Sequence, residues 1–275
     1  MNAIGPGRAA SLAAPRLAWR DGRITSGVRI VPDETPVALT YNRATLAVML
    51  ATPADLEDFA VGFSLTEGII DDPLQIEEMT IVPAAGGLEL RMWLSGERAQ
   101  IAERRRRRLA GPSGCGLCGI ESLDAAIPPV RTVADYVRFA ADEVFAAVRA
   151  LPMAQSLNHD THAVHGAAFW LPGEGLVATR EDVGRHNALD KLAGALARLN
   201  CSTSGGILLL SSRLSVELVQ KAAAIGVPVI AAISAPTGLA IRVAEQAGIT
   251  LVGVARDDGF EVFSRPDRLG LQEIA

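Results

Sequence analysis

The sequence is poor in cysteine, in lysine and in long apolar runs, and each shortage narrows what the protein can be. Three cysteines, one of them far from the other two, cannot build a disulfide framework, so we expect a reducing, cytoplasmic setting. No apolar run reaches the ~18–20 residues of a membrane helix, and the N-terminal residues carry no apolar signal core. The sequence therefore predicts no membrane association.

Charge and size set further bounds. Lys191 and Lys221 are the two lysines, so nearly all positive charge is arginine, although the formal net charge is −5. Arginine recognises phosphate and carboxylate with a two-pronged fork, but genomic base composition explains the same bias equally well. We expect no nucleic-acid partner. With 275 residues, about half of them apolar, the chain can form one large domain or two modest ones.

The first half reads as a small α+β subdomain. Residues 1–20 are rich in Ala, Arg, Pro and Gly without periodicity, and they predict a disordered leader. Short apolar runs then predict an antiparallel sheet, and Thr52 followed by Pro53 predicts a helix start with Thr52 as its cap. A hairpin is expected across residues 76–94. A helical pattern over 132–151 follows Pro129, which places the subdomain boundary near residue 130.

The second half, residues 131–275, has the pattern of an α/β domain. Residues 163–170 and 175–179 predict paired strands, and a helix is expected over 183–199. Strand and helix patterns then alternate from residue 207 to residue 255. Continuous apolar strands joined by helices indicate a parallel sheet covered on both faces. Ligands bind such sheets at the carboxyl edge of the strands.

The stretch that carries reactive groups is Ser113–Gly119, where Cys115 and Cys118 stand among glycines. Arg104–Arg108 lies just upstream, and cationic neighbours lower the pKa of a thiol. Sulfur carriage as a persulfide, a thioredoxin-like redox pair, a zinc site and two idle surface thiols all fit a CxxC pair. The zinc interpretation would need histidines about forty residues downstream, namely His159, His162 and His165. Cys201 has no cysteine nearby and is expected to be buried and inert.

Two loops at the predicted carboxyl edge carry polar residues that could bind an anion. Backbone amides and hydroxyls at helix N-termini accept phosphate, although each Ser or Thr taken singly is more often a simple helix cap. The residues are Ser211, Ser212, Arg213, Ser234, Thr237 and Gly238. In the charged stretch Glu181–Lys191, His186 has an ordinary pKa near neutrality and could move protons, and Asp182 could orient it or hold a ligand. A solvated helix end with ion pairs explains that stretch equally well.

Five motifs in order resemble the FdhD family of sulfurtransferase accessory factors for formate dehydrogenase. They are TPADLEDFAVGFSLTEGII (52–70), GCGLCG (114–119), EDVGRHNALDK (181–191), SSRLSVELVQK (211–221) and SAPTGL (234–239). The resemblance covers residues 24–268. It implies a carrier that takes sulfur from a cysteine desulfurase as a persulfide. The carrier passes the sulfur to the molybdenum or tungsten bis-guanine-dinucleotide cofactor before that cofactor enters the formate dehydrogenase catalytic subunit.

The resemblance also implies roles for particular residues and a fold. The persulfide cysteine matches Cys115, with Cys118 as its partner. The cofactor-contacting segment matches Phe263, Ser264, Arg265, Pro266, Asp267 and Arg268, where arginines suit a pyrophosphate. The larger domain is similar to the cytidine deaminase fold, a three-layer α/β/α arrangement, and the family is a homodimer. The protein is then expected to be an enzyme of the sulfurtransferase class, and a non-catalytic chaperone that binds the cofactor is the rival.

Comparison with zinc deaminases shows a departure. Deaminases need H-x-E and P-C-x-x-C, and the corresponding places here read His165-Gly166-Ala167 and Ser211–Ser215. The general acid and the cysteine ligands are missing, which argues against deamination. The same edge pocket could hold a flat heterocycle, so a guanine nucleotide such as GDP is expected to mimic the cofactor. We expect the Cys115 loop to swing to a pocket formed by both serine loops and Arg265.

Overall fold

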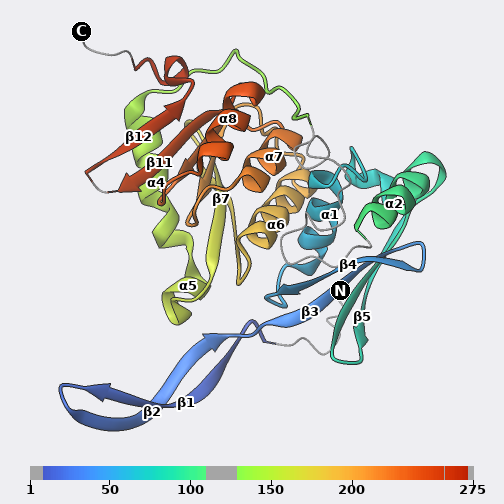
Figure 1. The fold of residues 1–275 in the computed structure, drawn as a ribbon, viewed down its shortest axis with the longest axis vertical. Coiled ribbons are helices and arrows are strands. Elements are labelled where there is room, and N and C mark those ends of the chain that lie inside the picture. Colours follow the sequence, from blue (N-terminus) through green and yellow to red (C-terminus); the bar gives the residue numbers. More distant parts are fainter. Residues whose placement is uncertain (1–8, 110–128, 257, 272–275) are drawn as a thin grey trace.

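The computed structural model describes residues 9–109, 129–256 and 258–271, which form two lobes and a projecting hairpin (Figure 1). The first lobe is built on a four-stranded sheet and the second on a six-stranded sheet. Both sheets combine with helices, so the chain has a mixed α/β fold. In the described part of the chain, no helix is long and apolar enough to cross a bilayer.

The hairpin consists of β1 (Ser11–Arg20) and β2 (Arg23–Pro32), paired antiparallel along their whole length. Asp21 and Gly22 connect them with φ values of 50° and 74°, the left-handed pair that a tight hairpin turn requires. The prediction of a disordered leader is wrong for residues 11–20. Their ladder depends on hydrogen bonds to β2, which the composition of residues 1–20 taken alone does not reveal.

The first lobe packs two helices on its sheet. In the strand order β4-β3-β6-β5, the bounds are β3 (Thr35–Tyr41), β4 (Ala44–Ala51), β5 (Glu78–Ala84) and β6 (Gly87–Trp93). Helices α1 (Leu56–Thr66) and α2 (Gly96–Leu109) and the short 3-10 helix η1 (Pro73–Gln75) complete it. Phe59 and Phe63 of α1 meet edge to face within its core, which Leu39 and Leu90 share. The predicted hairpin of 76–94 is confirmed as β5 and β6.

The second lobe is a three-layer arrangement. Its sheet has the order β12-β11-β10-β9-β7-β8, in which β9, β10 and β11 are parallel and the other pairs antiparallel. The strands are β7 (His165–Leu171), β8 (Gly175–Asp182), β9 (Ile207–Leu210), β10 (Val229–Ala232), β11 (Thr250–Arg256) and β12 (Gly259–Ser264). The expected sheet is therefore confirmed, with antiparallel strands added at both sides of its parallel centre.

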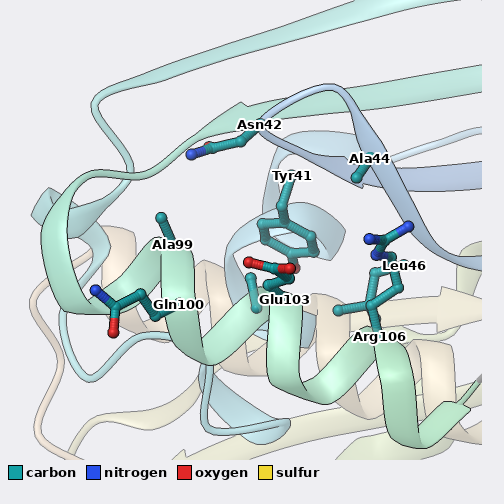
Figure 2. A pocket seen from close by; sticks show the side chains of 9 residues that line it. Tyr41, Asn42, Ala44, Leu46, Ala99, Gln100, Glu103 and Arg106 are labelled. Atoms are coloured by element: carbon teal, nitrogen blue, oxygen red, sulfur yellow. The ribbon is translucent and has the colours of Figure 1, made fainter.

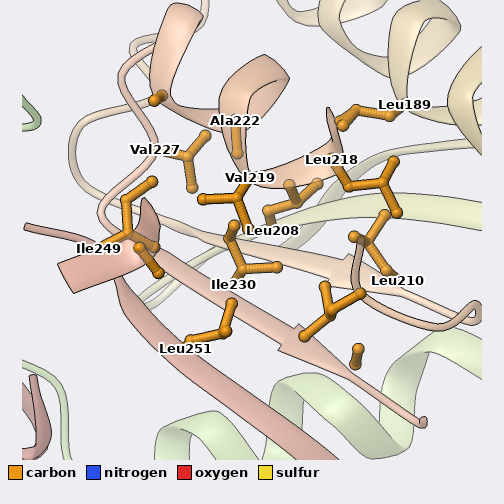
Figure 3. Close-up of a cluster of buried hydrophobic side chains, with 14 of the residues drawn as sticks. Leu189, Leu208, Leu210, Leu218, Val219, Ala222, Val227, Ile230, Ile249 and Leu251 are labelled. Atoms are coloured by element: carbon orange, nitrogen blue, oxygen red, sulfur yellow. The ribbon is translucent and has the colours of Figure 1, made fainter. Parts of the chain in front are cut away.

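Helices cover both faces of this sheet. Leu208, Ile230 and Leu251 point from the strands toward α7 in one core (Figure 3). The helices on that face are α6 (Arg185–Arg198), α7 (Val216–Ala224) and α8 (Gly238–Ala247), while α4 (Ala141–Ala154) packs on the other. The short elements are α5 (Ser156–Thr161) and η2 (Pro266–Leu269). The helix predicted over 132–151 begins only at Ala141. Val133 instead donates its backbone N–H to Ala247, and Phe139 donates to Arg268.

The two lobes meet where α1 crosses α6, and glycines make the crossing close. A Cβ on Gly62 would lie 1.6 Å from the carbonyl oxygen of Asp190, and a Cβ on Gly194 would lie 1.9 Å from that of Asp58. Real Cβ atoms do not tolerate such distances, so each position needs a residue without a side chain. The backbones of the two helices are therefore in direct contact.

Candidate functional site

Cys115 and Cys118 lie outside the described residues, and the arginine run before them lies on α2. Arg105 of this run forms an ion pair with Glu67, which also bonds Lys221 of α7 at 2.9 Å. Arg105 is therefore linked through Glu67 to a lysine of the second lobe. Helix α2 carries these arginines and extends to Leu109.

The two serine loops meet at the carboxyl edge of the parallel strands, as predicted. Leu214 donates its backbone N–H to Ala235, and Thr237 donates its own to Leu214. The Ser211 hydroxyl accepts the Gly166 N–H at 2.8 Å, so the start of β7 joins the same edge. The structure thus brings together the predicted residues Ser211, Ser212, Arg213, Ser234, Thr237 and Gly238.

Some of these side chains already have partners and others are open. Thr237 caps α8 by accepting the N–H of Ala240 at 3.3 Å, and Ser212 is buried with its hydroxyl bonded to the Arg213 carbonyl at 3.2 Å. Arg213 and Gly238 are exposed. The edge therefore offers an exposed guanidinium beside the N-terminus of α8, which is a suitable arrangement for an anion.

His186 lies on the first turn of α6 and is neutral at physiological pH. Burial, followed by the positive charges of Arg185 and Lys221, lowers its pKa to about 4. Burial and Arg185 also lower the pKa of His165 at the start of β7. The expectation that His186 titrates near neutrality is therefore wrong. The largest cause of the lowered pKa is burial, which the sequence does not show. Within the described chain, His186 Nε2 and Arg185 Nε are buried without a hydrogen-bond partner.

Asp182 is a structural residue in this chain. Its side chain is fully buried and pairs with Lys191 at 2.6 Å. The same carboxylate accepts the backbone N–H groups of Thr52 at 2.9 Å and Gly184 at 2.7 Å, together with the Asn187 amide at 3.0 Å. Every oxygen is engaged, so the predicted role in orienting His186 or holding a ligand is not supported by this geometry. The stretch Glu181–Lys191 does form ion pairs, but they are buried, so the expectation of a solvated helix end is wrong for Asp182, Asp190 and Lys191.

Thr52 connects this pair to the first lobe. Lys191 donates to its carbonyl at 2.8 Å, and its hydroxyl accepts the Val183 N–H at 3.1 Å. The prediction that Thr52 caps α1 is therefore wrong. Asp55 occupies that position, and Thr52 instead bonds residues about 130 positions away, a relation that local sequence cannot show.

The segment Phe263–Arg268 lies at the opposite end of the strands from the serine loops. β12 runs antiparallel to β11, so Ser264 pairs with Leu251 near the amino end of β11. The four-residue strand β10 alone separates the two ends by roughly 13 Å. The single pocket expected to contain both serine loops and Arg265 is therefore not formed within one chain. Phe263 is the exception, because its ring comes within contact distance of Gly253 beside Pro236.

The polar groups of Ser264–Arg268 bind the protein itself. Ser264 donates to the Ile249 carbonyl at 2.8 Å, and Arg265 pairs with Asp135 and Asp267, both at 2.9 Å. Arg268 is fully buried. Its guanidinium donates hydrogen bonds to three backbone carbonyls, one hydroxyl and one carboxylate. These belong to Pro228, Gly248 and Ala134, to Thr250, and to Asp135. Arg268 therefore holds the amino edge of the sheet together and has no surface to offer a pyrophosphate.

A charge network that the sequence did not predict lies between the lobes. Lys221 bonds Asp190 at 2.9 Å and Glu67 at 2.9 Å, and Thr66 donates to Asp190 at 2.6 Å. Burial opposes ionisation of Glu67, but Lys221 and Arg105 overcome it and lower its pKa to about 2. Asp190, which shares the same lysine while fully buried, has a raised pKa. The sequence carries one signal for this network, namely that Lys191 and Lys221 are the two lysines among many arginines; both are buried in the structure.

Other predicted residues and cavities lie apart from the sheet edge. Across the described ranges, no three His, Cys, Asp or Glu side chains are grouped to hold a metal. Cys201 is half-buried, and burial followed by Glu174 raises the pKa of its thiol. A cavity of about 230 Å³ lies between α2 and the β3–β4 turn, where Tyr41, Glu103 and Arg106 face one another (Figure 2).

Comparison with known proteins gives consistent results. The chain is 53% identical over 257 residues to the "Sulfur carrier protein FdhD" of Agrobacterium fabrum, covering 92% of this chain and 94% of the relative. The protein of the same name from Brucella abortus is 51% identical over 254 residues, with the same coverage. A crystal structure of a formate dehydrogenase accessory protein from Desulfotalea psychrophila matches with a TM-score of 0.72 and 27% identity. That match covers 94% of this chain and 99% of the other.

The model of the FdhD/NarQ family matches residues 32–270. This range contains both lobes, the charge network and all the predicted site residues, and leaves out most of the hairpin. The chain belongs to the FdhD/NarQ family.

Proposed function

We propose that this chain is a sulfur carrier that serves formate dehydrogenase. The observation that carries the proposal is identity of about 50% to relatives named as sulfur carriers, extending over nine-tenths of both chains. The solved neighbour described as a formate dehydrogenase accessory protein supports the identity of the enzyme that receives the sulfur. We place the activity in the cytoplasm, because a reactive thiolate needs a reducing environment.

The sulfur is carried by Cys115 as a persulfide. The Cys115 thiolate attacks the outer sulfur of a persulfide on a cysteine desulfurase, a new S–S bond forms, and the desulfurase cysteine leaves as a thiolate. Cys118 assists by thiol exchange. The exposed guanidinium groups of Arg104 and Arg106 on α2 favour the thiolate form of a nearby cysteine, while Arg105 is occupied by Glu67.

The acceptor is the molybdenum bis-guanine-dinucleotide cofactor, which is cargo and not a resident group. The carboxyl edge of the second lobe suits its guanine nucleotide end. Arg213 and the start of α8 offer an anion site, and the half-buried, neutral His186, close to Glu217 at the start of α7, offers an unpartnered ring nitrogen. Phe263 is the member of the C-terminal segment whose ring comes near these loops. GDP is therefore expected to bind at this edge.

Two further family properties belong to the proposal. The second lobe is cytidine-deaminase-like, which the three layers and the bonding of Gly166 to Ser211 support. Without an acid at Ala167 or cysteines in the Ser211 loop, it binds a heterocycle and does not deaminate it. The protein acts as a homodimer.

Mass spectrometry tests the sulfur chemistry directly. After incubation with a cysteine desulfurase and free cysteine, we expect a gain of one or more sulfur atoms on the peptide that contains Cys115. The Cys115→Ala variant should lose this gain and the activation of formate dehydrogenase in cells, while Cys201→Ala should retain both. Full activation by Cys115→Ala would instead indicate a chaperone that binds the cofactor without carrying sulfur.

Nucleotide binding tests the location of the acceptor site. Calorimetric titration with GDP should show weakened binding for Arg213→Ala and little change for Arg265→Ala, whose guanidinium is engaged by Asp135 and Asp267. The reverse result would place the nucleotide at the amino edge of the sheet and contradict the assignment to the serine loops.

A further inference from the structure

Helix α2 is attached to the segment that follows helix α1 by two ion pairs. Arg98 in the first turn of α2 pairs with Asp71, and Arg105, about two turns further along, pairs with Glu67. The two arginines are seven residues apart, so they lie on the same face of the helix. The side chain of Asp71 is 73% exposed, whereas that of Glu67 is 18% exposed. The Glu67 pair is therefore the better shielded from water and salt.

Glu67 also bonds the second lobe. Its carboxylate accepts a hydrogen bond from Lys221 of α7 at 2.9 Å while it holds Arg105 of α2. Lys221 lies six residues, or about 9 Å along the helix, after Ser215, the N-cap residue of α7. Ser215 ends the serine loop 211–215, which belongs to the edge proposed to bind the nucleotide. Glu67 therefore contacts the helix before the cysteine pair and the helix after this loop at the same time.

The buried part of this charge network is balanced without Glu67. Lys221 donates to both oxygens of Asp190, at 2.9 and 3.1 Å, so one buried cation already faces one buried carboxylate. Asp190 also accepts the Thr66 hydroxyl at 2.6 Å. The low pKa of Glu67, about 2, keeps its carboxylate ionised and able to hold Arg105 at physiological pH. Glu67 therefore serves the placement of α2 and not the neutralisation of Lys221.

Helix α2 directly precedes the cysteine pair in the sequence. Cys115 follows Leu109, the last residue of the helix, by six positions. Six residues of fully extended chain span at most about 22 Å, so the end of α2 limits the volume that the Cys115 sulfur can reach. A shift of α2 moves this volume by the same amount. A misplacement of about 1 Å in a reacting group can cost about 100-fold in rate, so the position of α2 matters for a transfer to a bound acceptor.

We propose that Glu67 is a positioning residue for sulfur transfer, because its carboxylate fixes the helix that precedes Cys115 relative to the helix that follows the serine loop. The inference rests on the proposed function, in which Cys115 carries the sulfur and the second lobe binds the acceptor. It separates the two halves of the reaction. Loading needs a thiolate that the desulfurase can approach. Handover needs the persulfide of Cys115 to meet the acceptor at one distance and angle, so handover depends on Glu67.

The test compares Glu67→Gln with Asp71→Asn in the full chain. Asp71 holds the same helix through Arg98 but, in the part of the chain that the structure describes, bonds no group of the second lobe. Loading is the fraction of Cys115 that carries extra sulfur after incubation with a cysteine desulfurase and free cysteine, measured by mass spectrometry. Handover is the activation of formate dehydrogenase in cells that lack the unmodified protein, divided by the amount of loaded chain recovered from them.

Glu67→Gln should keep loading within about twofold of the unmodified chain and reduce handover about tenfold or more, and Asp71→Asn should leave both unchanged. A second variant separates positioning from a loss of folding. The side chain of Arg105 is 36% exposed, so Arg105→Gln should fold, and it should show the same handover defect because it removes the same contact. The double variant should be no worse than either single variant, since both remove one interaction.

Three results would overturn the inference and leave the proposed function intact. They are equal handover in Glu67→Gln and Asp71→Asn, a loss of loading in proportion to the loss of handover, and additive defects in the double variant. A mere loss of stability would reduce the amount of chain and not the activation for each loaded chain. Absence of sulfur on Cys115 of the unmodified chain would overturn the proposed function, and this inference with it.

Discussion

Replacing Lys191 by Met should destabilise the protein strongly, because it leaves the Asp182 carboxylate buried without its counter-charge. Both side chains are fully buried, and their charged atoms are 2.6 Å apart. Removing one member of such a pair costs about 3–5 kcal/mol. Met has nearly the length of Lys, so little of the loss should come from a cavity. The backbone N–H groups of Thr52 and Gly184 would still bond the carboxylate, which favours the lower half of that range.

Urea denaturation and calorimetry measure the loss. For a chain of this size, 3–5 kcal/mol corresponds to a decrease of roughly 5–9 °C in the melting temperature. A double-mutant cycle with Asp182→Asn sharpens the measurement, because the neutral amide no longer needs a cation. The double variant should therefore be more stable than the sum of the two single losses implies.

A loss below about 1 kcal/mol for Lys191→Met would refute the reasoning, since a value of that size is typical of an exposed pair. The structural role is also testable against function. Sulfur loading of Cys115 and GDP binding, measured below the unfolding transition, should survive in the variant. If GDP binding disappeared while stability stayed unchanged, the pair would belong to the ligand site and not to the junction of the lobes.

Three further predictions concern the lobe junction, pH and the amino edge of the sheet. Gly62→Ala should destabilise by at least about 2–3 kcal/mol in urea, because its Cβ meets a backbone carbonyl, whereas Gly205→Ala, with no atom within 4 Å of its Cβ, should not. The folded pKa of His186, about 4, lies below the ordinary value of 6.5, so folding favours the neutral ring. The neutral ring of His186 contributes about 2–3 kcal/mol to the free energy of unfolding, which is complete above pH 6.5 and is lost as the pH falls toward 4. His186→Gln should therefore make the free energy of unfolding less dependent on pH across that interval. A second decrease in the free energy of unfolding should follow from about pH 4.5 to pH 2, the folded pKa of Glu67, and Glu67→Gln should lessen it. Arg268→Met should cost more than about 3 kcal/mol without changing GDP affinity, and weaker GDP binding in a stable variant would contradict its structural role.

Local sequence patterns were sufficient for most elements of the second lobe. Apolar runs and helical periodicity placed β9, α7, β10, α8 and β11, since each of these elements buries one continuous apolar face. They also placed the two serine loops side by side, because consecutive parallel strands end at the same edge. The family was recognised on the same motifs, and the comparisons confirm it.

The unpredicted features depend on contacts between distant residues or on strand direction. Asp182 is of a residue type that often binds ligands. Only the positions of Lys191 and Thr52 in the fold show that its carboxylate oxygens are already occupied. The position of Arg265 depends on β12 running antiparallel to its neighbour, which no local pattern specifies. Strand β1 was not predicted because residues 1–20 were judged by composition alone, whereas their pairing with β2 depends on both strands together.

The crossing of α1 and α6 limits how this protein can move. With Gly62 and Gly194 bringing main chain against main chain, the lobes cannot pivot at that point without pulling the helices apart, and buried ion pairs beside it oppose separation. The body then behaves as a rigid platform. A sulfur donor and a sulfur acceptor that visit in turn would meet the same fixed outline, so the handover has to be accomplished by short segments and by the visiting proteins themselves.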